Sequence, residues 1–135
     1  MRIEGKIVKG NSNASIRIGN YKSQFVAATK MPNLHVGTLN VEARDIKLRE
    51  NVAIWPDFMM EGKNLDKSHE DYLFEACTIY IRDEVYEGFR IRPYDRPTGG
   101  GGNGDHCLEI ITETILDVSA ETEVTLEFRD RVIKP

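Results

Sequence analysis

Thr38 and Asn40 stand two residues apart in the segment Gly37-Thr38-Leu39-Asn40-Val41. On a strand, residues two apart share a face, so the hydroxyl and the carboxamide oxygen point the same way. Two neutral oxygen ligands of this kind can hold a Mg²⁺ ion that also takes phosphate oxygens. The spacing therefore predicts a metal and phosphate site, with the outward polar face of a half-buried strand as the alternative.

A glycine-rich segment covers residues 97–105 and reads Pro-Thr-Gly-Gly-Gly-Gly-Asn-Gly-Asp. Glycines let backbone N–H groups approach and wrap an anion. Three arginines come shortly before it and would add positive charge: Arg90, Arg92 and Arg96. The segment is a candidate anion site, although its composition also suits a flexible loop tip.

The common nucleotide-binding and nucleophile motifs are absent from the sequence. It contains no Gly-x-x-x-x-Gly-Lys-Ser/Thr, no Gly-x-Gly-x-x-Gly after a strand and no Gly-x-Ser-x-Gly. Its histidines, His35, His69 and His106, lack the spacing of metal ligands. His106 and Cys107 are neighbours, but neighbours on a strand point to opposite faces, which argues against a metal site built on that pair.

Charge is distributed unevenly along the chain. Residues 1–40 carry six Lys or Arg and one acidic residue, whereas residues 41–135 carry 12 basic and 21 acidic residues, for a net charge of −4. An acidic total disfavours a general nucleic-acid-binding protein. The basic first third suits a local anion such as a phosphate, or merely covers one exposed face.

Length and composition indicate one globular domain over residues 1–135, because domains commonly contain about 100–150 residues. No stretch approaches the roughly 20 apolar residues of a membrane helix, and the first ten residues lack the core of a signal peptide. Two cysteines are too few for a disulfide scaffold. We therefore expect a cytoplasmic protein without a membrane segment, as a monomer or small homo-oligomer.

Short strands dominate the predicted elements. Apolar periodicity and turn residues predict strands at 2–9, 15–18, 37–43, 46–54, 73–81, 85–91, 107–111 and 122–129. In the last of these, Val124, Leu126 and Phe128 should face inward. Residues 55–71 and 93–105 read as loops.

One helix is predicted over residues 21–30, where Tyr21, Phe25 and Ala28 share a face. Asn20 is its candidate N-cap and Pro32 lies just beyond its end. A helical turn is expected within 113–119. Because no βαβ rhythm appears, the pattern predicts a mainly β, mostly antiparallel closed barrel with one or two short helices.

Several motifs follow one another in an order that resembles the archaeal-type CTP-dependent riboflavin kinases. The ordered motifs are Gly-Thr-Leu-Asn-Val at 37–41, Gly-Phe-Arg-Ile-Arg-Pro at 88–93, Leu-Glu-Ile-Ile at 108–111 and Glu-Val-Thr-Leu-Glu-Phe at 123–128. The resemblance covers nearly the whole chain. It implies a six-stranded cradle-loop β-barrel that transfers the γ-phosphate of CTP to riboflavin, giving FMN, with Mg²⁺ as cofactor.

The resemblance also implies roles for particular residues. Thr38 and Asn40 match the family's Mg²⁺ ligands, Glu109 matches its flavin-contacting glutamate, and Thr98 stands in for a threonine on the flavin side. The nucleotide is expected at two stretches: Gly10, Asn11, Ser12, Asn13, Ala14 and Ser15, and then Thr114, Ile115, Leu116 and Asp117.

The sequence departs from the family pattern in the first loop, where 11–15 replace a glycine-rich turn, and at Asp117, which replaces a cation. An anion near a triphosphate is unfavourable. Two alternatives therefore stay open. The first is a non-catalytic barrel that binds a nucleotide, a flavin or a phosphorylated metabolite, and the second is an interaction module.

Overall fold

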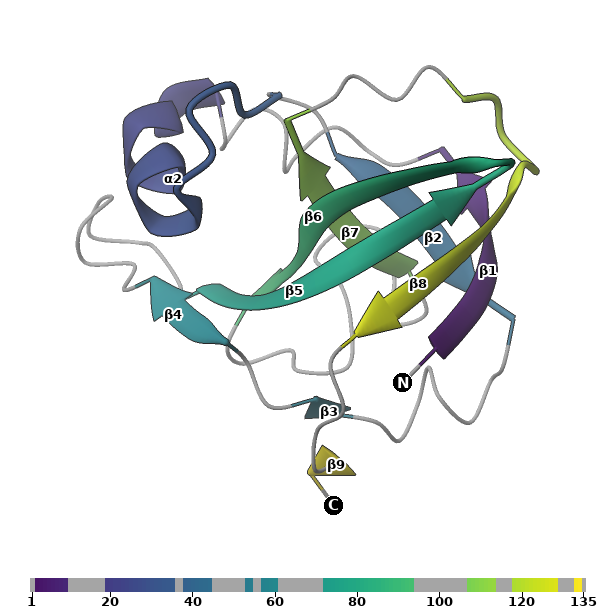
Figure 1. The fold of residues 1–135 in the computed structure, drawn as a ribbon. Helices are drawn as coiled ribbons and strands as arrows, with labels where there is room; N and C mark the ends of the chain where they lie inside the picture. The colour runs from purple at the N-terminus through teal and green to yellow at the C-terminus, as the bar shows by residue number, and fades with distance from the viewer. Residues whose placement is uncertain are drawn as a thin grey trace.

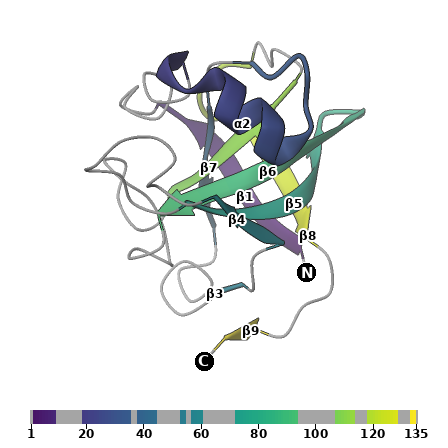
Figure 2. The same ribbon diagram turned by 90° about the vertical axis from the view of Figure 1, so that its left-hand side faces the viewer.

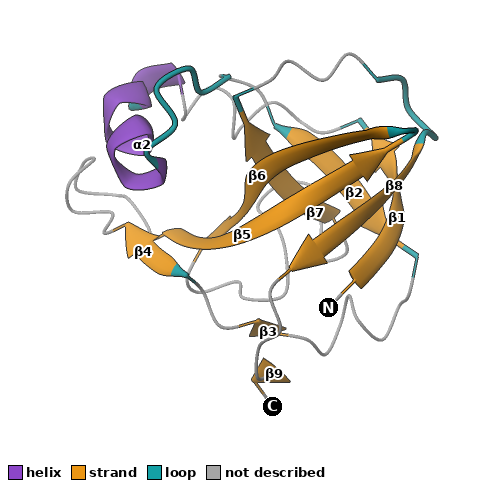
Figure 3. Ribbon diagram, viewed as in Figure 1, coloured by secondary structure: helices purple, strands orange, loops and turns teal. Residues whose placement is uncertain are grey.

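The computed structural model describes residues 2–9, 19–35, 38–44, 53–54, 57–60, 72–93, 107–113, 118–128 and 133–134. Strands make up most of this part of the chain (Figure 3). The elements, labelled in Figure 1, are β1 (Arg2–Val8), α2 (Lys22–Thr29), β2 (Leu39–Ala43), β3 (Ala53–Ile54), β4 (Phe58–Met60), β5 (Tyr72–Ile81), β6 (Glu84–Pro93), β7 (Cys107–Thr112), β8 (Glu123–Phe128) and β9 (Ile133–Lys134).

Six antiparallel strands close into a barrel in the order β5-β6-β7-β2-β1-β8, and β8 pairs back onto β5. The closing pairs run from Cys77 with Phe128 to Tyr80 with Thr125. Closure leaves no strand of the barrel with an open edge along the paired lengths. The predicted mainly β barrel is confirmed, and β4 extends the sheet beside β5 while β3 and β9 form a separate two-stranded pair.

The barrel interior is filled by alternate residues of the six strands. Val124, Leu126 and Phe128 of β8 are all at most 3% exposed, as the alternation predicts. The other members of this interior cluster are Ile3, Ile7, Val41, Ala43, Cys77, Ile79, Ile81, Leu108 and Ile110. Burial of these side chains is the main stabilising term of the barrel, at about 25 cal/mol per Å² of apolar surface.

Gly5 and Gly88 allow strands to approach closely at two places. A Cβ added to Gly5 would lie 2.3 Å from the carbonyl oxygen of Glu42, and one added to Gly88 would lie 2.5 Å from the carbonyl oxygen of Ile111. Only a residue without a side chain fits such contacts. These glycines therefore fix the β1–β2 and β6–β7 spacing on which the barrel depends.

The helix α2 covers the outer side of the barrel over β5, β6 and β7 (Figures 1 and 2). Its Phe25 is fully buried, with ring centroids 5.9 Å from Tyr72 and 6.0 Å from Phe74. Tyr21 and Ala28 pack on the same cluster, so the predicted helical face is confirmed. Figure 2 shows the helix lying across these strands.

The predicted N-cap of the helix is wrong. Tyr21, not Asn20, precedes α2, and no side chain caps its first turn. The helix ends at Thr29, and the next residue, Lys30, has a left-handed backbone (φ 59°) and donates its N–H to the Val26 carbonyl oxygen, with 2.8 Å between N and O. Packing of Phe25, rather than a cap, therefore stabilises this short helix.

The predicted loop over 55–71 is also wrong in part, because it contains β4. Asp57 explains why a strand begins there: its N–H donates to the Phe74 carbonyl oxygen (2.7 Å), and its Oδ2 accepts from the Ala76 N–H (2.5 Å). The first residues of β5 then pair with β4. Residues 58–60 are therefore a strand because they pair with β5, although the segment is too short to show periodicity in the sequence.

Several predicted elements lie outside the described residues: the strand at 15–18, most of the strand at 46–54, the loop at 93–105 apart from Pro93, which ends β6, and most of the turn at 113–119. The hairpin predicted at 73–81 and 85–91 is confirmed as β5 and β6, which turn at Arg82 and Asp83. Within the described ranges, no helix is long and apolar enough to cross a bilayer.

Candidate functional site

Asn40 of β2 and Glu109 of β7 are direct partners in the register of two adjacent antiparallel strands. Val41 belongs to the interior cluster and Leu39 packs against it, so Asn40 between them lies on the outer face. Leu108 and Ile110 place Glu109 on the outer face by the same argument. The structure therefore brings together a predicted metal ligand and the predicted flavin-contacting glutamate, which are far apart in the sequence.

Asn40 is held at both ends of its carboxamide. Its Nδ2 donates to the Thr38 carbonyl oxygen at 3.5 Å, and its Oδ1 accepts from the Cys107 thiol at 3.9 Å. Both contacts are at the long end of hydrogen bonding. Asn40 is only 8% exposed, whereas Thr38, just before β2, is half-buried.

Glu109 lies between two different neighbours in the sheet. Its register partner on β2 is Asn40, and its partner on β6 is the apolar residue Ile91. The residue is 7% exposed. A carboxylate at such a position is shielded from bulk water, which strengthens its interaction with any ligand that reaches it.

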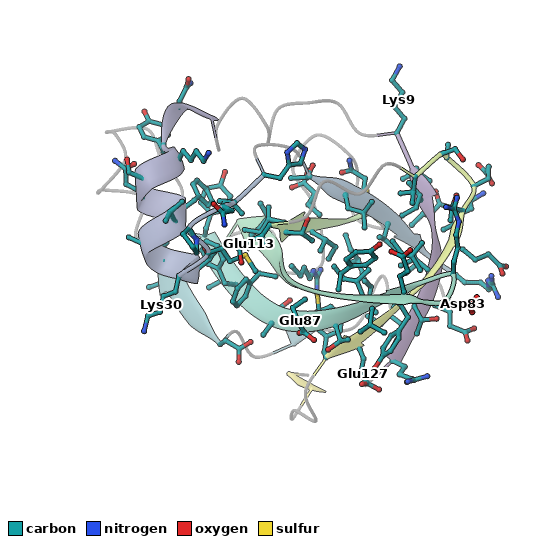
Figure 4. All side chains as sticks on the ribbon, turned by 45° about the horizontal axis from the view of Figure 1, so that its top comes forward. Lys9, Lys30, Asp83, Glu87, Glu113 and Glu127 are labelled. Atoms are coloured by element: carbon teal, nitrogen blue, oxygen red, sulfur yellow. The ribbon has the colours of Figure 1, made fainter. Side chains whose placement is uncertain are left out.

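The loop between α2 and β2 is tied to the end of β7. The Asn33 N–H donates to Glu113 Oε2 at 2.9 Å, and the His35 N–H donates to the Thr112 carbonyl oxygen at 2.9 Å. Figure 4 shows Glu113 on the side of the barrel that faces the helix. Leu34, between Asn33 and His35 in the chain, is 1% exposed. These contacts hold the chain that leads to Thr38 against the strand that carries Glu109.

Cys107 is buried beside the two site residues, on the same face of β7 as Glu109. Burial first, and then the carboxylates of Glu109 and Glu42, raise the pKa of Cys107 to about 11. Its sulfur is therefore a protonated thiol at neutral pH, and it donates to Asn40 Oδ1.

The residues fit a magnesium ion by the chemistry of their donors. Thr38 and Asn40 offer a hydroxyl and a carboxamide oxygen, which are hard oxygen ligands of the type Mg²⁺ prefers, and Glu109 lies opposite Asn40 across the strand pair. In the described part of the chain, the candidate site included, no three His, Cys, Asp or Glu side chains are placed to hold a metal ion.

A separate surface hollow of about 420 Å³ lies over β1, β2 and the start of β8. Two ion pairs cross it, Lys6 with Glu121 at 3.0 Å and Arg44 with Glu123 at 2.7 Å. The hydrogen bond that Lys6 Nζ donates to the Glu121 carboxylate raises the pKa of Lys6. The hollow is lined by neither Asn40 nor Glu109, so it is distinct from the candidate site.

The remaining predicted site residues lie outside the described residues and stay predictions: Gly10 to Ser15, Thr98 and Thr114 to Asp117. Arg96, His69 and His106 also lie outside them. Within the described part, Arg90 points into the barrel and pairs with Glu75.

Sequence reasoning missed two features, the Cys107–Asn40 contact and the interior pair of Glu75 and Arg90. The sequence does contain a signal for the pair of Glu75 and Arg90. Glu75 interrupts an apolar strand, and counting back from the hairpin turn places Arg90 opposite it. No sequence pattern signals the Cys107–Asn40 contact, because that contact depends on the register between β2 and β7.

No protein-family model matches the chain, and no curated protein is significantly similar to it.

Proposed function

We propose that this barrel is a cytoplasmic, Mg²⁺-dependent phosphotransferase of the riboflavin kinase type, which moves the γ-phosphate of CTP to the 5′-hydroxyl of riboflavin. The observation that carries the proposal is the direct pairing of Asn40 with Glu109 on the outer face of the barrel. The family motifs assign one of these residues to the metal and the other to the flavin, and a phosphoryl transfer needs both partners within one site.

Phosphoryl transfer depends on positioning and on neutralising charge rather than on a covalent protein intermediate. Thr38 and Asn40 would hold Mg²⁺, which when bound offsets the negative charge of the phosphate oxygens. Glu109 would accept a hydrogen bond from the acceptor and so orient its hydroxyl. Because Asn40 and Glu109 sit on paired strands of a closed barrel, the distance between their backbones is fixed before any ligand arrives.

The test is a direct assay of the purified protein with riboflavin, Mg²⁺ and CTP, ATP or GTP, in which FMN is separated from riboflavin by chromatography. We expect FMN with CTP, and a sharp loss of turnover in Thr38→Ala and in Asn40→Ala. Thr78→Ala is the matched control, since Thr78 carries a hydroxyl on the outer face of β5 and bonds Glu87 instead. Absence of FMN with every donor would end the proposal, and wild-type rates in both site variants would remove the metal assignment.

A second candidate is a barrel that binds a nucleotide or flavin without turning it over. The altered first loop at 11–15 and Asp117 favour it, because both weaken the expected hold on a triphosphate. A thermal shift panel of nucleotides and flavins separates the two candidates, since a ligand bound only by the folded state raises the melting temperature. Stabilisation without product supports binding alone.

A further inference from the structure

The Asn40 carboxamide has a different partner at each end. Nδ2 faces the carbonyl oxygen of Thr38 at 3.5 Å, and Oδ1 faces the thiol of Cys107 at 3.9 Å. The two ends of a carboxamide differ in chemistry, because nitrogen only donates and oxygen only accepts. If the carboxamide were reversed, Oδ1 would face the carbonyl oxygen of Thr38, and the Cys107 thiol would lose Oδ1 as its acceptor.

Cys107 reaches Asn40 because of the alignment of β2 and β7. Glu42 is opposite Cys107 and Asn40 is opposite Glu109, so Cys107 and Asn40 are diagonal neighbours on one face. Diagonal neighbours across an antiparallel pair lie about 7–8 Å apart at the backbone, within reach of their side chains. Cys107 is 2% exposed, so water does not compete for this contact.

We infer that Cys107 is a positioning residue, which together with the Thr38 carbonyl holds the Asn40 carboxamide in one orientation with Oδ1 directed toward β7. That orientation directs the only metal-ligating atom of Asn40 toward Cys107 on β7, the strand that also carries Glu109. The link to a metal rests on the proposed function, whereas the orientation itself does not.

The expected size of the effect follows from two considerations. Residues that orient a metal ligand from behind typically change metal affinity by 10- to 100-fold when removed. The Cys107 thiol is a weak donor at a long distance, so we expect its effect on metal affinity at the lower end of that range. Hydrogen bonds around ligand-free sites are often long and shorten in the loaded state. We therefore expect Cys107→Ala to weaken divalent metal binding about tenfold.

The first experiment measures the order of the Asn40 side-chain amide by ¹⁵N relaxation in the full chain, with the resonance assigned by its loss in Asn40→Asp. We expect the order parameter to fall in Cys107→Ala and to return in Cys107→Ser, whose hydroxyl restores a donor. Cys77→Ala is the matched control, because it truncates an equally buried cysteine that points into the barrel. Equal side-chain order in Cys107→Ala and wild type would overturn the inference.

The second experiment titrates the same proteins with Mn²⁺ and follows paramagnetic broadening of the Asn40 side-chain resonance. We expect weaker binding in Cys107→Ala, recovery in Cys107→Ser and wild-type affinity in Cys77→Ala. Unchanged affinity in Cys107→Ala contradicts the positioning role. If the wild-type protein binds no Mn²⁺, the proposed metal site fails, and the relaxation experiment still decides the orientation by itself.

Discussion

Glu75 and Arg90 face each other inside the barrel, with Arg90 Nη1 3.4 Å from Glu75 Oε2 and exposed fractions of 0% and 3%. They are direct register partners on β5 and β6. Glu75 lies on the same face of β5 as Cys77 and Ile79 of the interior cluster. An ion pair in apolar surroundings must overcome the cost of removing both charges from water.

Removing one charge of this pair should destabilise the barrel strongly. We expect Glu75→Gln to lower the free energy of unfolding by about 3–5 kcal/mol, because the buried Arg90 then loses the counter-charge that Glu75 supplies. The double variant Glu75→Leu with Arg90→Met should recover most of the loss. Urea unfolding measures both, and Arg2→Ala, which breaks an exposed pair with Glu127, should change the result little. A loss below about 1 kcal/mol in Glu75→Gln would contradict the prediction.

Gly5→Ala should also destabilise the protein, by a different mechanism. The added methyl carbon would lie 2.3 Å from the Glu42 carbonyl oxygen, so β1 and β2 must separate. Overpacking of this kind costs about 1–3 kcal/mol. Thermal and urea unfolding are the measurements, and Val85→Ala at a 59% exposed strand position is the control, expected within about 0.5 kcal/mol. Equal stability of Gly5→Ala and wild type would mean that this contact relaxes freely.

Glu109→Gln should reduce the turnover of the proposed kinase by about 100-fold, since an amide oxygen accepts the hydrogen bond of the acceptor hydroxyl more weakly than a charged carboxylate and cannot take up its proton. The nearly equal shape of Gln should preserve the fold. The measurement is FMN formation at saturating CTP and riboflavin. The control is Glu42→Gln, which should retain activity. Glu42 lies on the outer face of β2 as Asn40 does, but its register partner on β7 is Cys107, whereas that of Asn40 is Glu109. Full activity in Glu109→Gln would remove this residue from the site.

Stability should decline at alkaline pH because of the buried thiols. Burial raises the pKa of Cys77 to about 12, whereas in the unfolded chain the thiol titrates near its ordinary value. The unfolded state therefore loses its proton first, and the stabilising contribution present below about pH 9 is lost as pH rises toward the folded value. The slope is about 1.4 kcal/mol per pH unit for each thiol.

This alkaline loss is measured by urea unfolding between pH 8 and pH 10.5. Cys77→Ala should show a smaller decline than wild type, because one of the two buried thiols has been removed. Parallel declines in the two proteins would show that Cys77 titrates alike in the folded and unfolded chains.

Local periodicity was enough to predict most of the elements. The alternation of Val124, Leu126 and Phe128 predicts the inward face of β8, and the spacing of Tyr21, Phe25 and Ala28 predicts the packed face of α2. Such patterns are informative because each element must bury one face whatever its partner is. The class of fold followed from these elements without any knowledge of their pairing.

Elements that depend on a distant partner were predicted less well. β4 is only three residues long and forms because Asp57 and the start of β5 bind it. The expected cap at Asn20 was replaced by the packing of Phe25 against Tyr72 and Phe74. In both cases contacts from far along the chain outweighed the local preference.

The sequence by itself determined the types of group at the candidate site, namely a hydroxyl, a carboxamide and a carboxylate in three short motifs. Only the tertiary structure decided that Asn40 lies opposite Glu109 and that the Cys107 thiol contacts the Asn40 carboxamide. The physical reason is that strand register is set by closure of the whole barrel, through pairs such as Cys77 with Phe128. A shift of one residue would turn every side chain to the other face, and no local pattern reports that alignment.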